Sequence, residues 1–204
     1  MIVKQLEATD LLTTNVYFYI DEKTKHAFLI DPATEAQKIL DFIKNEGLVI
    51  EKILITHGHF DHIGAVQEIS EALDVPYFAH EAAKDYFLHA SMNLSSFFSH
   101  PFELQHATYF SEGEKFFLST SREKCLRVIH TPGHTEDSVI YIDDKEEIAF
   151  VGDTIFKNGV GRTDMPGGSA VALKDSLLNK IFTLPENTVL YSGHSEATTV
   201  GAEK

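Results

Sequence analysis

Six consecutive residues concentrate side chains that can bind a metal ion. They read His57-Gly58-His59-Phe60-Asp61-His62 and are separated from an apolar run at 53–55 only by Thr56. Neutral imidazole and carboxylate together suit Zn²⁺, Fe²⁺ or Mn²⁺ without selecting one of them. His57 and His59 lie two positions apart, so both can face one ion from a turn, whereas Asp61 and His62 are displaced enough to face a second. The segment therefore predicts a metal site, with ligands for two ions.

Three further turns each carry a ligand-type side chain with a glycine beside it. They are Thr131-Pro132-Gly133-His134, Gly152-Asp153 and Ser192-Gly193-His194, which follow apolar runs at 126–129, 148–151 and 189–191. Glycine suits positions where the backbone turns tightly to aim a neighbouring side chain. We therefore expect four strand ends to bring their ligands together, as in catalytic sites formed by loops at a sheet edge.

The elements that must position these residues form a mixed α and β pattern. A hairpin is expected over 14–20 and 26–30, helices over 34–45, 63–73 and 169–181, and strands over 50–55, 75–79, 114–118, 126–129, 139–142, 147–151 and 188–191. Periodicity alone gives only this mixed class. With no long linker or repeat, we expect one domain over residues 1–204.

Composition favours a small-molecule enzyme. The 17 basic and 31 acidic residues give a formal charge of −14, which argues against nucleic-acid and anionic-membrane partners. The N-terminus lacks a signal-peptide core, and no apolar stretch approaches the roughly 20 residues that span a bilayer. Cys125 is the single cysteine, which fits a reducing cytoplasm. The sequence does not set the oligomeric state.

The order of the motifs resembles a known superfamily. T-H-x-H-x-D-H, then T-P-G-H-T, then G-D and G-H resemble the metallo-β-lactamase-fold hydrolases over nearly the whole chain. The segment Gly159-Val160-Gly161-Arg162-Thr163-Asp164-Met165-Pro166-Gly167-Gly168 is similar to the glyoxalase II-like branch, including its short single-domain members, and to the persulfide dioxygenases. The resemblance implies a four-layer αββα sandwich of the α/β (α+β) class.

The resemblance also assigns the ligands. It implies His57, His59 and His134 on one divalent ion, Asp61, His62 and His194 on a second, and Asp153 bridging them. Zinc is expected, with iron and manganese as alternatives. A hydroxide shared by the ions would be the nucleophile, because a metal lowers the pKa of bound water to about 7, and Asp61 could orient it. The expected activity is hydrolysis of a small-molecule thioester, such as an S-acyl glutathione.

Substrate contacts are less defined. Arg162 stands where the glyoxalase II-like enzymes place a basic substrate contact, so it is predicted to bind a substrate carboxylate; the alternative is a pair with Asp164 that holds the loop. The chain ends soon after His194, so no C-terminal helical glutathione-binding domain is expected. The residues Phe87, Met92, Phe97, Phe98 and Phe102 are interpreted as core, with a substrate groove as the alternative.

Other assignments stay open. A mononuclear iron persulfide dioxygenase would use His57, His134 and Asp153 as a two-histidine, one-carboxylate set. A redox binding module is a third reading, which His59 disfavours because the diiron flavoproteins of this fold normally have glutamate there. His130 could support one of the metal-binding side chains without contacting the metal itself, but we do not include it among the site residues. Asp31-Pro32 is interpreted as a plain turn.

Overall fold

The computed structural model describes residues 1–98, 100–121 and 123–204. In this part of the chain the first sheet consists, in spatial order, of β1 (Ile2–Thr9), β2 (Thr13–Ile20), β3 (His26–Ile30), β4 (Val49–Leu54), β5 (Tyr77–His80) and β6 (Thr108–Phe110). The second consists of β14 (Thr198–Thr199), β13 (Val189–Ser192), β10 (Ile148–Gly152), β9 (Val139–Asp143), β8 (Cys125–His130) and β7 (Lys115–Phe117). A separate ribbon pairs β11 (Ile155–Phe156) with β12 (Gly159–Val160).

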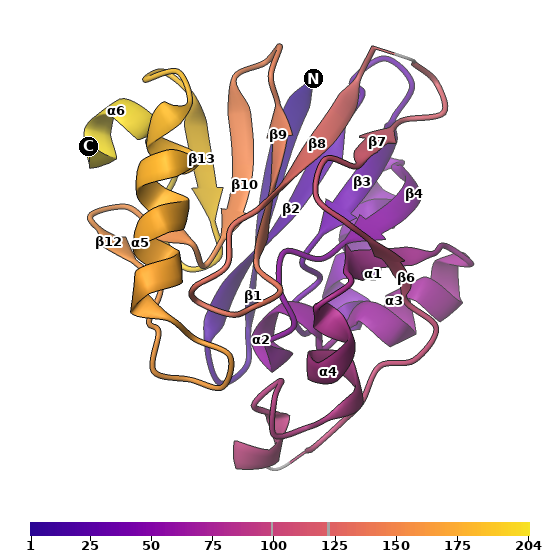
Figure 1. Cartoon of the computed structure of the whole chain (residues 1–204). Coiled ribbons are helices and arrows are strands. Elements are labelled where there is room, and N and C mark those ends of the chain that lie inside the picture. Colours follow the sequence, from indigo (N-terminus) through magenta and orange to yellow (C-terminus); the bar gives the residue numbers. More distant parts are fainter. Residues whose placement is uncertain (99, 122) are drawn as a thin grey trace.

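The helices lie outside the two sheets. They are α1 (Ala36–Glu46), α2 (Phe60–Ile63), α3 (Val66–Leu73), α4 (Ala83–Leu88), α5 (Ala170–Asn179) and α6 (Val200–Glu203). Figure 1 shows α1 and α3 on the side of the first sheet and α5 on the opposite side, next to the second sheet. Within the residues described above, no helix has both the length and the apolar character needed to cross a bilayer.

The central strands of both sheets are apolar at successive positions, which explains why each sheet is covered on both faces. On β2, Tyr17 points into the core between the sheets, while Phe18 points into the core under α1 and α3. On β9, Tyr141 faces the same inter-sheet core and Ile140 faces the core beneath α5. Because side chains alternate along a strand, such strands are buried on both faces. Three cores separate four layers, which confirms the αββα sandwich.

The structure corrects one predicted helix. The expected helix over 63–73 is divided into α2 and α3. The break follows from a contact with an earlier turn, because the Ala65 amide donates to the Ala33 carbonyl at 2.9 Å instead of continuing one helix. A Cβ atom at Gly64 would press against the same carbonyl oxygen. The turn after β3 therefore separates the two helices, which periodicity at 63–73 does not reveal.

Among the described residues, five strands were not predicted: the long β1 and the short β6, β11, β12 and β14. β1 pairs antiparallel with β2 along its whole length, from Ile2 opposite Ile20 to Thr9 opposite Thr13. Its sequence mixes apolar and charged residues, and most of them are only partly buried, as is usual at a sheet edge. The β1–β2 turn brings residues 10–12 to the end of the sandwich where the ligand motifs lie.

Candidate metal centre

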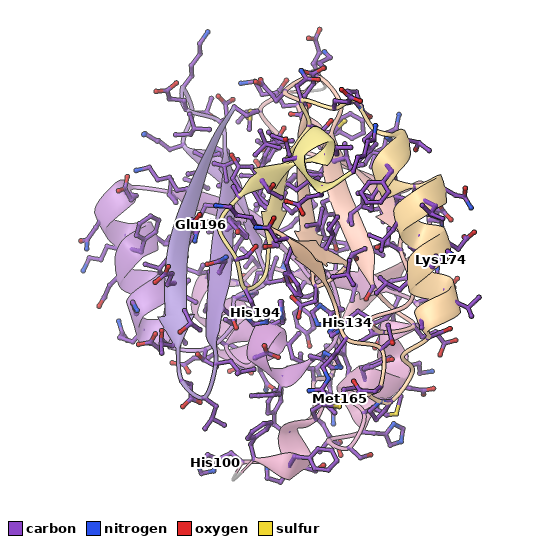
Figure 2. The ribbon with its side chains drawn as sticks, turned by 90° about the vertical axis from the view of Figure 1, so that its left-hand side faces the viewer. His100, His134, Met165, Lys174, His194 and Glu196 are labelled. Atoms are coloured by element: carbon purple, nitrogen blue, oxygen red, sulfur yellow. The ribbon has the colours of Figure 1, made fainter. Side chains whose placement is uncertain are left out.

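The predicted ligands come from four strand ends in two sheets. His57, His59, Asp61 and His62 follow β4 of the first sheet, and the last two lie on α2. His134, Asp153 and His194 follow β8, β10 and β13 of the second sheet. His134 and His194 lie at the same end of the sandwich, beyond the strands that precede them (Figure 2). The sheet-edge arrangement expected from the sequence is therefore present.

Three histidines form the first ligand group. One ligand atom from each of His57, His59 and His134 lies within 4.8 Å of the others. Nε2 of His134 and Nδ1 of His59 are 3.0 Å apart. All three side chains are buried. This is the first set that the sequence predicts.

The second group contains Asp61, His62 and His194, with ligand atoms again within 4.8 Å of one another. Nε2 of His194 lies 3.1 Å from Oδ2 of Asp61 and 3.3 Å from Nε2 of His62. His62 is fully buried, whereas His194 is partly exposed. The second group is thus more open to solvent on the His194 side.

Asp153 lies between the two groups. Its Oδ1 is 3.4 Å from Nε2 of His62, and its Oδ2 is 3.6 Å from Nε2 of His134. Gly193 permits this approach, since a Cβ there would overlap Oδ1 of Asp153 and the His62 ring. One carboxylate can therefore contact both groups, as the bridging assignment requires.

Hydrogen bonds on the outer ring nitrogens fix how the histidines face the centre. His134 donates from Nδ1 to the Arg162 carbonyl at 2.8 Å, and His194 donates from Nδ1 to the Thr13 carbonyl at 2.8 Å. Each bond leaves Nε2 as a lone-pair donor toward a cation, because a neutral imidazole carries one proton. Such outer contacts are typical of metal-binding histidines.

The protonation states also fit a cation. Burial holds the pKa of His57 well below its ordinary value, and burial together with His134 lowers the pKa of His59 to about 3. Burial opposes ionisation of Asp153, but contacts with His62 and His194 outweigh it and hold its pKa well below the usual range. Nε2 of His57 and Oδ1 of Asp153 are buried without a hydrogen-bond partner in the described part of the chain. His57 and His59 are thus already neutral. In contrast, contacts with Asp153 and Asp61 outweigh burial and raise the pKa of His62 above its ordinary value and that of His194 to about 10. A divalent metal would displace the extra protons of these two rings, because metal binding requires neutral imidazole and ionised carboxylate.

Asp31 is a site residue that the sequence reading missed. The Thr56 amide donates to its Oδ1 at 2.7 Å, and His62 Nδ1 donates to its Oδ2 at 2.9 Å. Asp31 also lies within 4.8 Å of His57 and His62 as a ligand set. Its oxygens are already engaged, however, and it meets the His62 nitrogen that points away from the second group. We therefore interpret it as orienting His62. The only sequence signal was an Asp-Pro pair at a strand end, and the structure adds a positive φ of 47°.

Tyr86 braces the ligand loops, and Asp137 is buried near Gly58. Tyr86 of α4 accepts from the Glu136 amide at 3.1 Å and donates to the Pro166 carbonyl at 3.1 Å. Asp137 is 1% exposed, and burial raises its pKa to about 7. A side chain at Gly58 would overlap Tyr86 and approach Asp137. The sequence does not indicate these contacts, because they form only where α4 packs against residues 57–59 and 133–138.

His130 lies outside both ligand groups. Its Nε2 donates to the Glu136 carbonyl at 2.7 Å, and its ring stacks on His80 with centroids 4.1 Å apart. It therefore holds the loop that carries His134, without facing the centre.

Arg162 forms an ion pair with Asp164, which the sequence left as the alternative to a substrate contact. Its Nε and Nη2 donate to the two carboxylate oxygens of Asp164 at 2.7 and 2.8 Å. Both side chains are exposed, and Arg162 lines the cavity above the ligands. A direct substrate contact by Arg162 stays a prediction.

A cavity of about 580 Å³ opens above the ligand residues, with His59, Asp61, His134, Asp153 and His194 in its lining. Two of the phenylalanines interpreted as core line it as well. Phe97 is 73% exposed and Phe98 is 37% exposed, so the core interpretation was wrong for both, whereas Phe87 is fully buried. Phe97, at the end of the 3₁₀ turn Ser95–Phe97, and Phe98 line the cavity instead of entering the core.

The family model described as the metallo-beta-lactamase superfamily matches residues 9–194, and the chain belongs to this superfamily. It is similar to the probable metallo-hydrolase YqgX of Bacillus subtilis (strain 168), with 36% identity over 200 residues that cover 95% of this chain and 90% of the relative. It is also similar to the hydroxyacylglutathione hydrolase GloC of Haemophilus influenzae, with 32% identity over 190 residues that cover 88% and 85%.

Solved structures agree with this placement. The chain is similar to the BLEG-1 B3 metallo-beta-lactamase, with a TM-score of 0.91 and 35% identity over 99% of this chain and 96% of that one. It is also similar to TTHA1623 in a di-iron-bound form, with a TM-score of 0.86 and 31% identity over 98% and 96%. The fold, the superfamily and a candidate metal-binding site are thus established, while iron stands beside zinc as a candidate metal.

Proposed function

We propose that the protein is a binuclear metal-dependent hydrolase that cleaves acyl thioesters, in the manner of the glyoxalase II type. The observation that carries the proposal is the pair of ligand groups joined by Asp153, whose two oxygens face His62 and His134. The similarity to a hydroxyacylglutathione hydrolase supports the thioester as substrate. The persulfide dioxygenase alternative would need only His57, His134 and Asp153, and gives no role to Asp61, His62 and His194.

Two bound divalent ions would supply a nucleophile at neutral pH, by lowering the pKa of water to about 7, and would polarise the substrate carbonyl. The chain's own contribution is to hold the seven ligands in place before substrate arrives. The proposed ligands are His57, His59 and His134 for one ion and Asp61, His62 and His194 for the other, with Asp153 between them. Zinc is proposed for both sites, with iron or manganese as alternatives.

Asp61 is proposed to have a second role. Its Oδ2 lies within 3.1 Å of His194 Nε2 and accepts a long hydrogen bond of 3.5 Å from the Thr14 hydroxyl. Burial opposes its ionisation, yet His62 and His194 lower its pKa, so the carboxylate is charged and can orient a water molecule at the cavity floor. The leaving thiol has an ordinary pKa of about 8.5 and departs as a thiolate with little help from an acid.

The test is hydrolysis under strict anaerobiosis. Protein saturated with Zn²⁺, Mn²⁺ or Fe²⁺ is assayed with S-D-lactoylglutathione and with a simple acetyl thioester. We expect two ions per chain, thioester cleavage without oxygen, and loss of activity in His194→Ala. Val171→Ala, at an exposed position on α5, is the matched control and should retain activity.

Two outcomes would contradict the proposal. Oxygen uptake with glutathione persulfide, with no thioester cleavage by any metal form and no effect of His194→Ala, would establish the dioxygenase alternative. A stoichiometry of one ion at saturating metal would contradict the binuclear site. A β-lactam assay belongs in the same series, because BLEG-1 is a B3 metallo-beta-lactamase.

A further inference from the structure

We infer that the cavity selects thioesters with an apolar, uncharged body, such as unbranched acyl chains, over thioesters of the charged tripeptide glutathione. This inference rests on the proposed thioester hydrolysis and concerns the same cavity. A volume of about 580 Å³ lies within the range of small-molecule sites. The walls and the charges around the cavity define which molecule fits.

Three segments that are distant in sequence supply the apolar walls. Leu12 comes from the β1–β2 turn, Phe97 and Phe98 from the segment after α4, and Phe156 and Val160 from the β11–β12 ribbon. Leu12, Phe97 and Val160 are 48%, 73% and 49% exposed. Large apolar side chains that gather at the mouth of a pocket, around a polar floor, mark a binding site for an apolar ligand.

The charges nearby disfavour an anionic body. Arg162 is the one arginine or lysine in the described lining, and its guanidinium is bound bidentately by Asp164. The pair is electrically neutral as a unit, so Arg162 offers little net attraction to a substrate carboxylate. The proposed ligand residues at the floor are occupied by the metals and the reacting carbonyl, so they are not available to bind a carboxylate elsewhere on the substrate. Apart from the metal ions proposed at the floor, a glutathione carboxylate therefore meets no unpaired lysine or arginine among the described lining residues.

A second cavity next to the first also disfavours an anionic substrate. It has a volume of about 330 Å³, shares Phe60 and Phe98 with the first cavity, and is lined by Asp10, Glu68 and Glu35, of which Glu35 is paired with Lys38 at 3.1 Å. The rings of Phe60 and Phe98 pack against each other with centroids 4.4 Å apart. A substrate that passes beyond Phe98 would meet carboxylates. With the net charge of −14, this favours a neutral or apolar group over an anion.

The experiment varies chain length at constant charge. The metal-saturated protein is given acetyl, butanoyl and hexanoyl thioesters of N-acetylcysteamine, a neutral thiol, beside S-D-lactoylglutathione. Burial of a methylene is worth about 0.8 kcal/mol, so kcat/KM should rise roughly two- to fourfold per added methylene. Calorimetric binding of the uncleavable S-methyl and S-hexyl thioethers of the same thiol gives a readout without hydrolysis. The S-hexyl compound should bind more tightly, with a more negative heat-capacity change.

Two variants locate the effect. Phe97→Ala should flatten the dependence on chain length in both measurements, whereas Val171→Ala, which removes an 81% exposed apolar side chain away from the cavity, should leave it unchanged. Asp164→Asn should release Arg162 and lower KM for lactoylglutathione while leaving the neutral series unaffected. The double variant Arg162→Ala with Asp164→Asn should lose that gain.

The outcomes separate this inference from the proposed function. Cleavage of every thioester with a flat dependence on chain length, and preference for lactoylglutathione, would overturn the apolar selection and leave hydrolysis standing. Chain-length-dependent thioether binding without cleavage of any thioester would support the ligand class and overturn hydrolysis. Self-association that Phe97→Ala abolishes, with no thioether binding, would show that the apolar mouth binds a second copy and overturn the inference.

Discussion

Asp31 determines which nitrogen of His62 is available to a metal. Because its carboxylate only accepts, Nδ1 of His62 must carry a proton, and Nε2, which faces Asp61 and His194, is the nitrogen that can give up its proton and offer a lone pair to a metal. The residue occupies a left-handed backbone conformation that costs energy for a side chain other than glycine. A strained, buried acid that holds a ligand ring is better explained by the metal centre than by the turn alone.

Asp31→Asn should weaken the second metal site selectively. The asparagine amide can donate to Nδ1 of His62 and so place the ring proton on Nε2, where the cation must bind. We expect the affinity of the second Zn²⁺ to fall about 10- to 100-fold, with little change at the first site. Titration against a competing chelator measures both affinities. Asp21→Asn, at a buried aspartate in the β2–β3 turn, is the control, and an equal loss at both sites would contradict the assigned role.

At the scale of elements, the centre depends on how α4 packs between two loops. The Tyr86 hydroxyl joins α4 to the loop after His134 and to the loop that contains Arg162. The Arg162 carbonyl of the latter loop also accepts a hydrogen bond from Nδ1 of His134. A change in the position of α4 is therefore transmitted to a ligand through two backbone hydrogen bonds.

Tyr86→Phe should destabilise the protein without removing any ligand. The substitution leaves the Glu136 amide and the Pro166 carbonyl without their partner, so we expect the free energy of unfolding to fall by about 1–3 kcal/mol. Urea unfolding of the two proteins in the same metal state measures the difference. Tyr109→Phe, at a 37% exposed position, should change stability by much less. Equal stabilities for Tyr86→Phe and the parent protein would refute the bracing role.

At the scale of the whole molecule, folding buries the carboxyl group of Asp137, which has no ion pair within the described residues. Burial raises the pKa of Asp137 to about 7, compared with 3.8 for an exposed aspartate. The folded state therefore favours its protonated form. Stability from this group is fully present below about pH 3.8, declines as the unfolded chain loses its proton, and is gone above about pH 7.

Asp137→Asn should remove this pH dependence. For the metal-stripped protein, the variant's stability advantage should grow from about pH 4 to pH 7 and then stay constant, reaching roughly 4 kcal/mol because each pKa unit is worth about 1.4 kcal/mol. Denaturant unfolding at a series of pH values measures the difference. A constant difference across this range, or one that grows toward acid pH, would show that Asp137 is ionised in the folded protein.

The ligand set could be predicted from sequence because it is encoded locally. His57 to His62 lie within six residues, and the other three ligands each follow an apolar run, so their residue types and order are legible without a fold. The strands were predictable for the same reason, since their alternating burial follows from side-chain geometry within one segment. The predicted helix at 63–73 is interrupted by a contact with Ala33, and the edge strand β1, the helix α4 and the short strands β6, β11, β12 and β14 were not predicted.

The amino-acid sequence by itself determined the kind of chemistry: imidazoles and carboxylates at four strand ends, in the order of a metal-dependent hydrolase superfamily. Only the tertiary structure decided that Asp31 holds His62 and that Arg162 is bound by Asp164. It also decided that Phe97 faces a cavity instead of the core. The physical reason is that periodicity and motifs report interactions between neighbours in the chain. These contacts depend instead on how helices, sheets and loops pack across long separations and on which atoms are left free when they do.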